Sequence, residues 1–264
     1  MKIISFNVNG LRARIKDNTI FEIIELEKPD ILCLQEIKCK EEDIKDFIEK
    51  INLIYPFQFY NSSIEKRGYS GTAILSKYRP RKEFKEPIIT NEGRIITLFY
   101  DNFILINLYS PNSGRELKRL NERINYWEKK LDELIKNYII NYPNYYIVIC
   151  GDFNVASKEI DINLKSTNIN SIAGFTKEER ESHNSLIFSN NLVDIFRFKN
   201  PNKREFTWFG KYINAYIKNI DKMFGMRIDK FLISKNLIKC VKNIYSLQTI
   251  YGSDHIPIIL ETFN

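Results

Sequence analysis

The chain has 264 residues, of which 44% are hydrophobic and 13% aromatic, and these values are typical of a folded globular protein rather than a disordered one. Its apolar runs are too short to cross a bilayer, and a first strand is expected directly after Met1, so no membrane-spanning or targeting segment is predicted. The net charge of +7 favours an anionic partner, with nucleic acid first, although the codon bias of an AT-rich genome is an alternative source of the many lysines.

Strand and helix signals alternate along the first half of the chain. Residues 3–6 predict a strand that ends at Asn7, and residues 19–28 predict a helix that Pro29 ends. Residues 31–34 predict a second buried strand, which is followed by Gln35 and Glu36. Residues 94–100 and 103–109 flank Asp101-Asn102 and predict a β-hairpin.

The clearest helix is predicted to begin at Ser113, because Glu116 completes a capping-box pattern three residues later. Apolar residues then recur at helical spacing and predict one buried stripe. They are Leu117, Leu120, Ile124, Trp127, Leu131 and Leu134. Residues 158–171 and 208–227 predict long connections on either side of a helix over 177–190. No repeat or low-complexity linker divides the chain, so residues 1–264 are expected to form one domain.

Four cysteines are scattered along the chain and form no CxxC pair, so neither a structural zinc site nor a disulfide framework is expected. They are Cys33, Cys39, Cys150 and Cys240. Cys33 and Cys150 lie in runs that predict buried strands, where a thiol behaves as a small hydrophobe. The thiols are expected to be reduced.

The most informative stretch is Gly151-Asp152-Phe153-Asn154, which follows the apolar run 145–150 without a spacer. Such a run predicts a central strand, and open α/β sheets place their chemistry at the carboxyl ends of their strands. Taken alone, the stretch also fits a turn in which Gly151 has a positive φ and Asp152 caps the next element.

Other strand boundaries carry similar side chains, namely Asn7, Glu36 and Asp254-His255. Carboxylates and carboxamides that converge on one rim offer the hard oxygen ligands that Mg²⁺ prefers. Of the two histidines, His183 lies in a polar helical stretch and is expected at the surface, whereas His255 lies between an acid and a strand. Oxygen ligands with one histidine fit metal-assisted hydrolysis of a phosphoester.

Eight segments, in chain order, resemble the exonuclease III type of apurinic/apyrimidinic (AP) endonuclease, within the endonuclease/exonuclease/phosphatase superfamily. The segments are Ser5-Phe6-Asn7-Val8-Asn9-Gly10-Leu11-Arg12, Leu34-Gln35-Glu36, Gly68-Tyr69-Ser70-Gly71, Tyr109-Ser110-Pro111-Asn112-Ser113-Gly114, Gly151-Asp152-Phe153-Asn154, Ala173-Gly174-Phe175-Thr176, Arg227-Ile228-Asp229 and Gly252-Ser253-Asp254-His255. Each segment alone is weak evidence, but together they span nearly the whole chain. The resemblance implies an α/β fold, a four-layer α/β sandwich in which helices flank two packed, mainly antiparallel β-sheets, with the active site on one rim.

The resemblance implies a Mg²⁺ site, with Mn²⁺ as a substitute. Glu36 is the principal ligand it implies, with Asn7 and Asp254 nearby and with Asp152 and Asn154 as further candidates. It leaves open whether one metal ion binds or two.

Catalytic roles are also implied by the resemblance. Asp152, assisted by Asn154, is the expected general base, and Tyr109 is expected to contact the phosphate. His255 is expected to donate to the scissile phosphate while Asp229 holds its other ring nitrogen. Whether Asp152 or Tyr109 removes the proton of the attacking water stays open.

The resemblance also implies contacts with DNA, which are less specific than the catalytic roles. The candidate contacts are Arg12, Gly68, Tyr69, Asn112, Arg115 and Lys118. Trp208, Met226 and Ile228 are expected to wall an apolar pocket for a sugar that has lost its base. Some family members carry Trp where this chain has Met226, so the balance of exonuclease against endonuclease activity stays open.

The predicted function is cleavage of double-stranded DNA on the 5′ side of an abasic site, with cleaning of blocked 3′ ends and 3′→5′ exonuclease action as secondary activities. A monomer without a membrane partner is expected, cytoplasmic and nucleoid-associated if the source is prokaryotic. The alternatives are another phosphoesterase of the superfamily, acting on RNA or phosphoinositides, and a catalytically silent DNA-binding protein. The silent protein is disfavoured because Glu36, Asp152 and His255 are all present.

Overall fold

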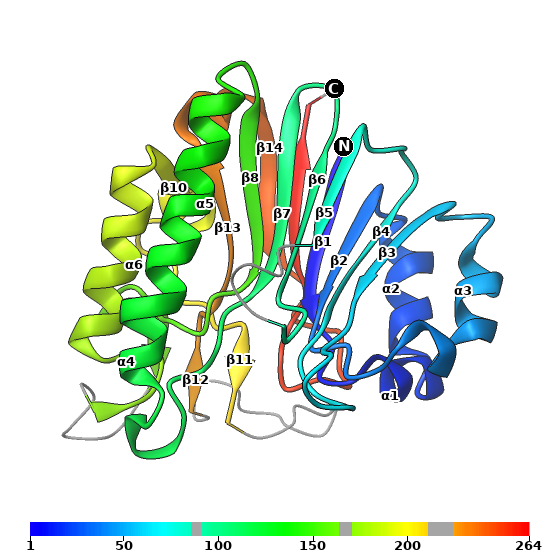
Figure 1. Ribbon diagram of the computed structural model, residues 1–264, viewed down its shortest axis with the longest axis horizontal. Coiled ribbons are helices and arrows are strands. Elements are labelled where there is room, and N and C mark those ends of the chain that lie inside the picture. The colour runs from blue at the N-terminus through cyan, green and yellow to red at the C-terminus, as the bar shows by residue number, and fades with distance from the viewer. Residues whose placement is uncertain (86–90, 164–170, 211–223, 264) are drawn as a thin grey trace.

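Two six-stranded β-sheets pack face to face in the computed structural model, and helices cover the outer face of each sheet (Figure 1). The structure describes residues 1–85, 91–163, 171–210 and 224–263. The predicted four-layer α/β sandwich is therefore confirmed. None of the described helices is long and apolar enough to cross a membrane.

The first sheet has the strand order β14-β15-β1-β2-β4-β3. Its strands are β1 (Lys2–Asn7), β2 (Ile31–Gln35), β3 (Phe57–Asn61), β4 (Thr72–Ser76), β14 (Val241–Ser246) and β15 (Ile258–Thr262). Only β1 and β2 run parallel, and the other neighbours in this sheet are antiparallel. The strands predicted over 3–6 and 31–34 are confirmed as β1 and β2.

The second sheet has the order β10-β13-β8-β7-β6-β5. Its strands are β5 (Lys82–Lys85), β6 (Ile95–Phe99), β7 (Phe103–Tyr109), β8 (Tyr146–Asp152), β10 (Leu192–Asp194) and β13 (Asp229–Ser234). Here β7 and β8 are the parallel pair. The predicted hairpin is confirmed as β6 and β7, which pair antiparallel.

Apolar side chains fill three layers of the sandwich. Cys33 and Cys150 are fully buried in the layer between the sheets, and all four cysteines are free thiols, as predicted. Helices α1 (Leu11–Lys16), α2 (Thr19–Glu27) and α3 (Lys45–Ile51) cover the first sheet, and α5 (Glu128–Asn141) and α6 (Lys177–Ser189) cover the second (Figure 1). The predicted helices over 19–28 and 177–190 correspond to α2 and α6.

The helix predicted to begin at Ser113 begins later and in pieces. Ser113 is buried and its hydroxyl donates to Glu179 of α6, so it does not cap a helix. Glu116 has φ 57° inside a short 3₁₀ turn and forms ion pairs with its neighbours instead of a capping box. After α4 (Leu120–Glu122) comes a π-helical turn, Arg123–Trp127, which leads into α5. The capping-box prediction is wrong because a tertiary contact uses the serine.

Only part of the predicted apolar stripe is buried. Trp127 and Leu131 are fully buried, whereas Leu117 and Leu120 precede the regular helix and are half-buried. The surface prediction for His183 is wrong as well, because this residue lies on the inner face of α6 and is only 1% exposed.

The two predicted long connections contain a third, small sheet. Strands β11 (Trp208–Phe209), β12 (Gly225–Met226) and β9 (Ile162–Asn163) pair in that order. Their neighbours at 164–170 and 211–223 lie outside the described residues. A short helix, α7 (Ile195–Lys199), follows β10.

Candidate active site

Each large sheet contains one parallel strand pair, and both pairs end at the same rim. Asn7 is the last residue of β1, and Glu36 directly follows β2. Tyr109 and Asp152 end β7 and β8, where they are register partners. The two pairs pack against each other across the sandwich, so these four side chains meet at one edge, as expected for the carboxyl ends of parallel strands.

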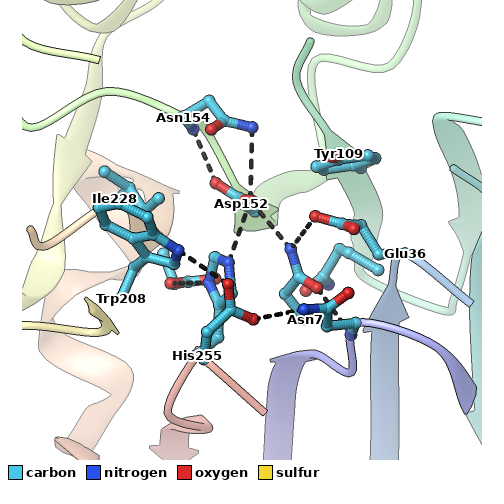
Figure 2. A network of polar contacts seen from close by, with 12 residues as sticks. Asn7, Glu36, Tyr109, Asp152, Asn154, Trp208, Ile228 and His255 are labelled. Atoms are coloured by element: carbon cyan, nitrogen blue, oxygen red, sulfur yellow. Dashed lines mark hydrogen bonds and ion pairs between the residues drawn. The ribbon is translucent and has the colours of Figure 1, made fainter. Parts of the chain in front are cut away.

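Asp152 lies at the centre of the rim and is almost completely buried (Figure 2). The Asn7 amide donates one hydrogen bond to Asp152 Oδ2 at 3.0 Å and another to Glu36 Oε1 at 2.9 Å. The backbone N–H of Asn154, a residue with φ 49°, donates to Asp152 Oδ1 at 2.8 Å. His255 Nε2 lies 3.8 Å from Asp152 Oδ2. One carboxylate thus contacts the residues that the sequence analysis grouped as ligands and as catalytic groups.

His255 is held as a charged proton donor. Its Nδ1 lies 2.9 Å from Oδ2 of Asp229, the first residue of β13 and the register partner of Asp152. Burial alone would lower the pKa of the imidazole, but Asp229 and then Asp152 outweigh it and raise that pKa to about 10. Since Nδ1 is engaged by Asp229, Nε2 is the nitrogen that faces Asp152.

The two carboxylates of the rim have opposite pKa shifts. Burial raises the pKa of Asp152 to about 7, with His255 opposing the rise and Asp229 adding to it. Glu36 is half-buried, but Lys38 at 2.7 Å and then the Asn7 amide outweigh the effect of desolvation and lower the Glu36 pKa. Environments that separate the pKa values of two neighbouring acids divide their roles, one as a fixed anion and one as a proton acceptor.

Tyr109 keeps its phenolic proton at neutral pH. Burial and then the Glu36 charge raise its pKa well above the usual range, against the lowering effect of Arg94. The Arg94 guanidinium lies 4.6 Å from the centre of the Tyr109 ring and donates to the Tyr109 carbonyl at 3.0 Å. The phenol is therefore a hydrogen-bond donor in this site.

The donor set of the rim fits a divalent cation. One ligand atom each from Glu36, Asp152 and His255 lies within 4.8 Å of the others. His255 is held in its protonated form, which leaves the two carboxylates and the Asn7 amide as oxygen donors of the kind Mg²⁺ prefers. Asp254 lies beside this set, where its Oδ1 accepts from Asn9 and its Oδ2 accepts from the Trp208 indole at 3.0 Å.

A cavity of about 150 Å³ opens onto the rim. Its apolar side contains Trp208, Met226 and Ile228. Its polar side is lined by Glu36, Tyr109, Asp152, Asp254 and His255. Asn154 also lines it and donates to the Ser110 carbonyl at 2.8 Å. The predicted pocket residues thus face the predicted catalytic residues across one small cavity (Figure 2).

Most candidate DNA contacts lie outside this cavity. Asn112 lines it and donates to Asn154 Oδ1 at 2.9 Å. Arg12, Gly68, Arg115 and Lys118 are exposed to solvent. The half-buried Tyr69 accepts hydrogen bonds from Arg94 at 2.9 Å and from Arg119 at 3.1 Å.

The sequence analysis missed Lys38 and Arg94. Lys38 contacts Glu36 and Arg94 supports Tyr109, so both act on predicted site residues. The sequence signals available were a cation two residues after the acid at a strand end, and an arginine directly before the mainly apolar strand β6.

Comparison with known proteins gives one consistent answer. The model of the Endonuclease/Exonuclease/phosphatase family matches residues 4–255. A DNA-(apurinic or apyrimidinic site) endonuclease of Dictyostelium discoideum is 37% identical over 98% of this chain and 69% of its own length. An exodeoxyribonuclease of Bacillus subtilis is 34% identical over 98% of each chain. The crystal structure of an AP endonuclease from Leishmania major superposes with a TM-score of 0.83 at 28% identity, covering 98% of this chain and 86% of the other.

Proposed function

The chain belongs to the endonuclease/exonuclease/phosphatase family, and from that membership we propose a class II AP endonuclease. It is an enzyme and a DNA-repair nuclease, as its relatives over nearly the full chain indicate. The proposed reaction is hydrolysis of the phosphodiester on the 5′ side of an abasic site, which leaves a 3′-hydroxyl and a 5′ deoxyribose phosphate. Cleaning of blocked 3′ ends and 3′→5′ exonuclease action are the proposed secondary activities.

The observation that carries this proposal is the contrast between Asp152 and His255 at one cavity. Asp152, with a pKa of about 7, accepts the proton of the attacking water near neutral pH. His255 Nε2 donates a hydrogen bond to an oxygen of the scissile phosphate and balances the charge that develops there. Asp229 fixes the imidazole in that orientation through Nδ1. Tyr109 acts as a neutral donor to the phosphate, so we assign the role of general base to Asp152.

The proposed cofactor is Mg²⁺, with Mn²⁺ as a substitute. Glu36 would hold it, together with Asp152 and Asn7, and Asn154 and Asp254 would support this set from either side. When bound, the cation neutralises phosphate charge and lowers the pKa of water. The residues of the chain then supply orientation and proton transfer.

The proposed substrate is double-stranded DNA that contains abasic sites or blocked 3′ ends. The apolar wall of Trp208, Met226 and Ile228 favours a bare sugar, because the cavity of about 150 Å³ is small. The candidates for DNA contact are Arg12, Gly68, Tyr69, Asn112, Arg115 and Lys118, and all of them except the half-buried Tyr69 are exposed. We propose that residues 1–264 work as one catalytic domain and as a monomer, which would be cytoplasmic and nucleoid-associated if the source is prokaryotic.

The first test uses an end-labelled duplex with one tetrahydrofuran abasic analogue, incubated with Mg²⁺ or with EDTA. An intact duplex and the Asp152→Asn variant are the controls. We expect one cut on the 5′ side of the analogue, dependent on Mg²⁺ and absent in the variant. Well-folded protein that binds DNA without cutting it would indicate a silent binding protein. Cleavage confined to RNA or phosphoinositides, tested in parallel, would assign the site to another phosphoesterase.

A further inference from the structure

Lys230 is a buried lysine next to the active site that plays no part in the mechanism above. Only 1% of its surface is exposed. Its ammonium group donates to the Val155 carbonyl at 2.7 Å and to Ser157 Oγ at 2.6 Å, and lies 3.0 Å from Nε2 of His183. These three partners use all three of its N–H donors.

All three acceptors are uncharged. Burial, and then Lys230 itself, lower the pKa of His183, so its imidazole is neutral and accepts the lysine proton at Nε2. Within the described residues, no carboxylate forms a salt bridge with Lys230. Placing a cation in the interior costs free energy, and burial, followed by Arg227, lowers the pKa of the Lys230 ammonium group. Its hydrogen bonds, together with Asp194 and Asp161 beyond salt-bridge distance, offset only part of this cost. A purely structural need for stability is therefore a poor explanation of a lysine at this position.

The segment to which Lys230 donates hydrogen bonds directly follows Asn154, which is a predicted catalytic residue. Val155 and Ser157 follow Asn154, whose backbone has φ 49°, a left-handed conformation that needs support from its surroundings. Asn154 in turn donates to Asp152 Oδ1 through its backbone N–H at 2.8 Å. A short chain of contacts thus runs from the Lys230 ammonium through the turn to the proposed general base.

The neighbour of Lys230 carries the other half of the site. Asp229 holds His255, and Asp229 pairs with Asp152 across β13 and β8. Side chains alternate between the faces of a strand, so Asp229 points to the rim while Lys230 points to the helix-covered face, like Leu232 two residues on. Asp229 therefore fixes the His255 imidazole on one face of β13, and the adjacent Lys230 holds the turn that contains Asn154 on the other face.

We propose that Lys230 is a positioning residue for phosphodiester hydrolysis, which holds the turn from Asp152 to Ser157 in register with Asp229 by donating hydrogen bonds to Val155 and Ser157. This inference rests on the proposed function for its kinetic test. His183 completes the hydrogen bonding of the ammonium group, and its ring packs edge-on against Phe153 of the turn with 5.3 Å between the ring centroids, a contact that a phenylalanine at 183 can keep. Of these two residues, only Lys230 donates to the turn, so substitutions at Lys230 and at His183 are expected to have separable effects on the turn.

The test compares Lys230→Met with the matched control His183→Phe. Both variants place an apolar side chain in the same buried cluster, but only Lys230→Met releases Val155 and Ser157. At saturating DNA and Mg²⁺, we expect Lys230→Met to lower the single-turnover rate constant about 10-fold to 100-fold, because a small displacement of catalytic groups has that effect. We expect His183→Phe to stay within about 2-fold, and DNA affinity to change by less than about 2-fold in both.

A double variant separates positioning from general destabilisation. If Lys230 acts through Asn154, Lys230→Met should slow the Asn154→Ala enzyme by less than about 2-fold, because coupled residues are not additive. A full additional loss in the double variant, or equal losses in Lys230→Met and His183→Phe, would overturn the proposal.

Hydrogen exchange of the segment 151–157 gives a readout that needs no substrate. We expect faster exchange of this segment in Lys230→Met than in the wild type and in His183→Phe, with the rest of β8 unchanged. Should the wild type fail to cut abasic DNA, the proposed function fails, and the exchange result alone decides whether Lys230 holds the turn. Wild-type exchange in the variant overturns the inference. If Lys230→Met does not fold, Ser157→Ala removes one of the two hydrogen bonds from Lys230 to the turn, and hydrogen exchange of the segment 151–157 is compared in the same way.

Discussion

The turn from Asp152 to Ser157 has a front and a back with opposite electrostatic character. At the front, the carboxylates of Glu36, Asp152 and Asp229 crowd around His255. At the back, cationic side chains point at backbone carbonyls, as Lys230 does at Val155. The front gathers three carboxylates around one imidazole, whereas the cations of the back donate to backbone carbonyls and, at Arg123, also lie beside two buried carboxylates. The crowded carboxylates of the front are thus held in position by hydrogen bonds that the cations of the back donate to the turn.

Arg123 is the second cation of the back and is fully buried. Its guanidinium donates to the Pro111 carbonyl at 2.7 Å and to the Phe153 carbonyl at 2.5 Å, which joins the segment of Asn112 to the turn. It also lies 3.4 Å from Glu128 and 3.9 Å from Glu179.

The largest effect is expected where the front is neutralised. In Asp152→Asn, a carboxamide replaces the proton acceptor, so the single-turnover rate should fall by about 10³-fold or more. The melting temperature should stay equal or rise, because the variant removes a buried charge from a negative cluster. Rate measurements with a thermal melt check both statements. A loss of less than about 10-fold would assign the proton transfer to another group.

Removing a cation of the back should reduce the stability of the fold instead of removing a catalytic group. Arg123→Met leaves Glu128 and Glu179 without their buried cation, so the free energy of unfolding should fall by about 3–5 kcal/mol. The matched control is Lys136→Met, which removes a surface pair with Asp132 at 2.6 Å and should change stability by less than about 0.5 kcal/mol. Urea unfolding measures both variants. Equal stability of the two would show that the back does not support the fold.

Asp229→Asn sharpens the comparison because it alters the front without removing a reacting group. We expect the rate at neutral pH to fall about 10-fold to 100-fold. Asp229 raises the pKa of His255 against burial, so its removal lowers that pKa and the imidazole loses its proton at a lower pH. The alkaline limb of the pH–rate profile should therefore move to lower pH. An unmoved limb would mean that His255 does not titrate in that limb.

The smallest effect is expected outside both faces. Arg115 has a side chain that is 93% exposed, so Arg115→Ala should weaken DNA binding only a few-fold and reduce the slope of log affinity against log salt by about 1. Lys129→Ala, an exposed cation on α5, is the control and should leave the slope unchanged. Binding titrations at several salt concentrations decide whether Arg115 contacts phosphate.

The front was predictable from the sequence because short apolar runs mark strands and the residues after them mark strand ends. Asn7, Glu36 and Asp152 each follow such a run, and the structure brings them together. The back was not predictable in this way. His183 lies among charged residues on α6, yet it faces inward toward Lys230, so a polar pattern that normally indicates a surface conceals a buried contact.

The helix start predicted at Ser113 was also wrong because of a long-range contact. Ser113 and Glu116 have the spacing of a helix start, but the hydroxyl of Ser113 bonds to Glu179, a residue far along the chain. A single long-range contact outweighs a local propensity of about 1 kcal/mol.

The position of β1 between β15 and β2 has a consequence for how a cell makes this enzyme. Asn7 is translated long before His255, which directly precedes β15, the strand that pairs with β1, so the two residues can meet only in a chain that reaches β15. Every shorter nascent chain lacks the group proposed to donate to the phosphate. Cleavage is therefore expected only after β15 has docked beside β1.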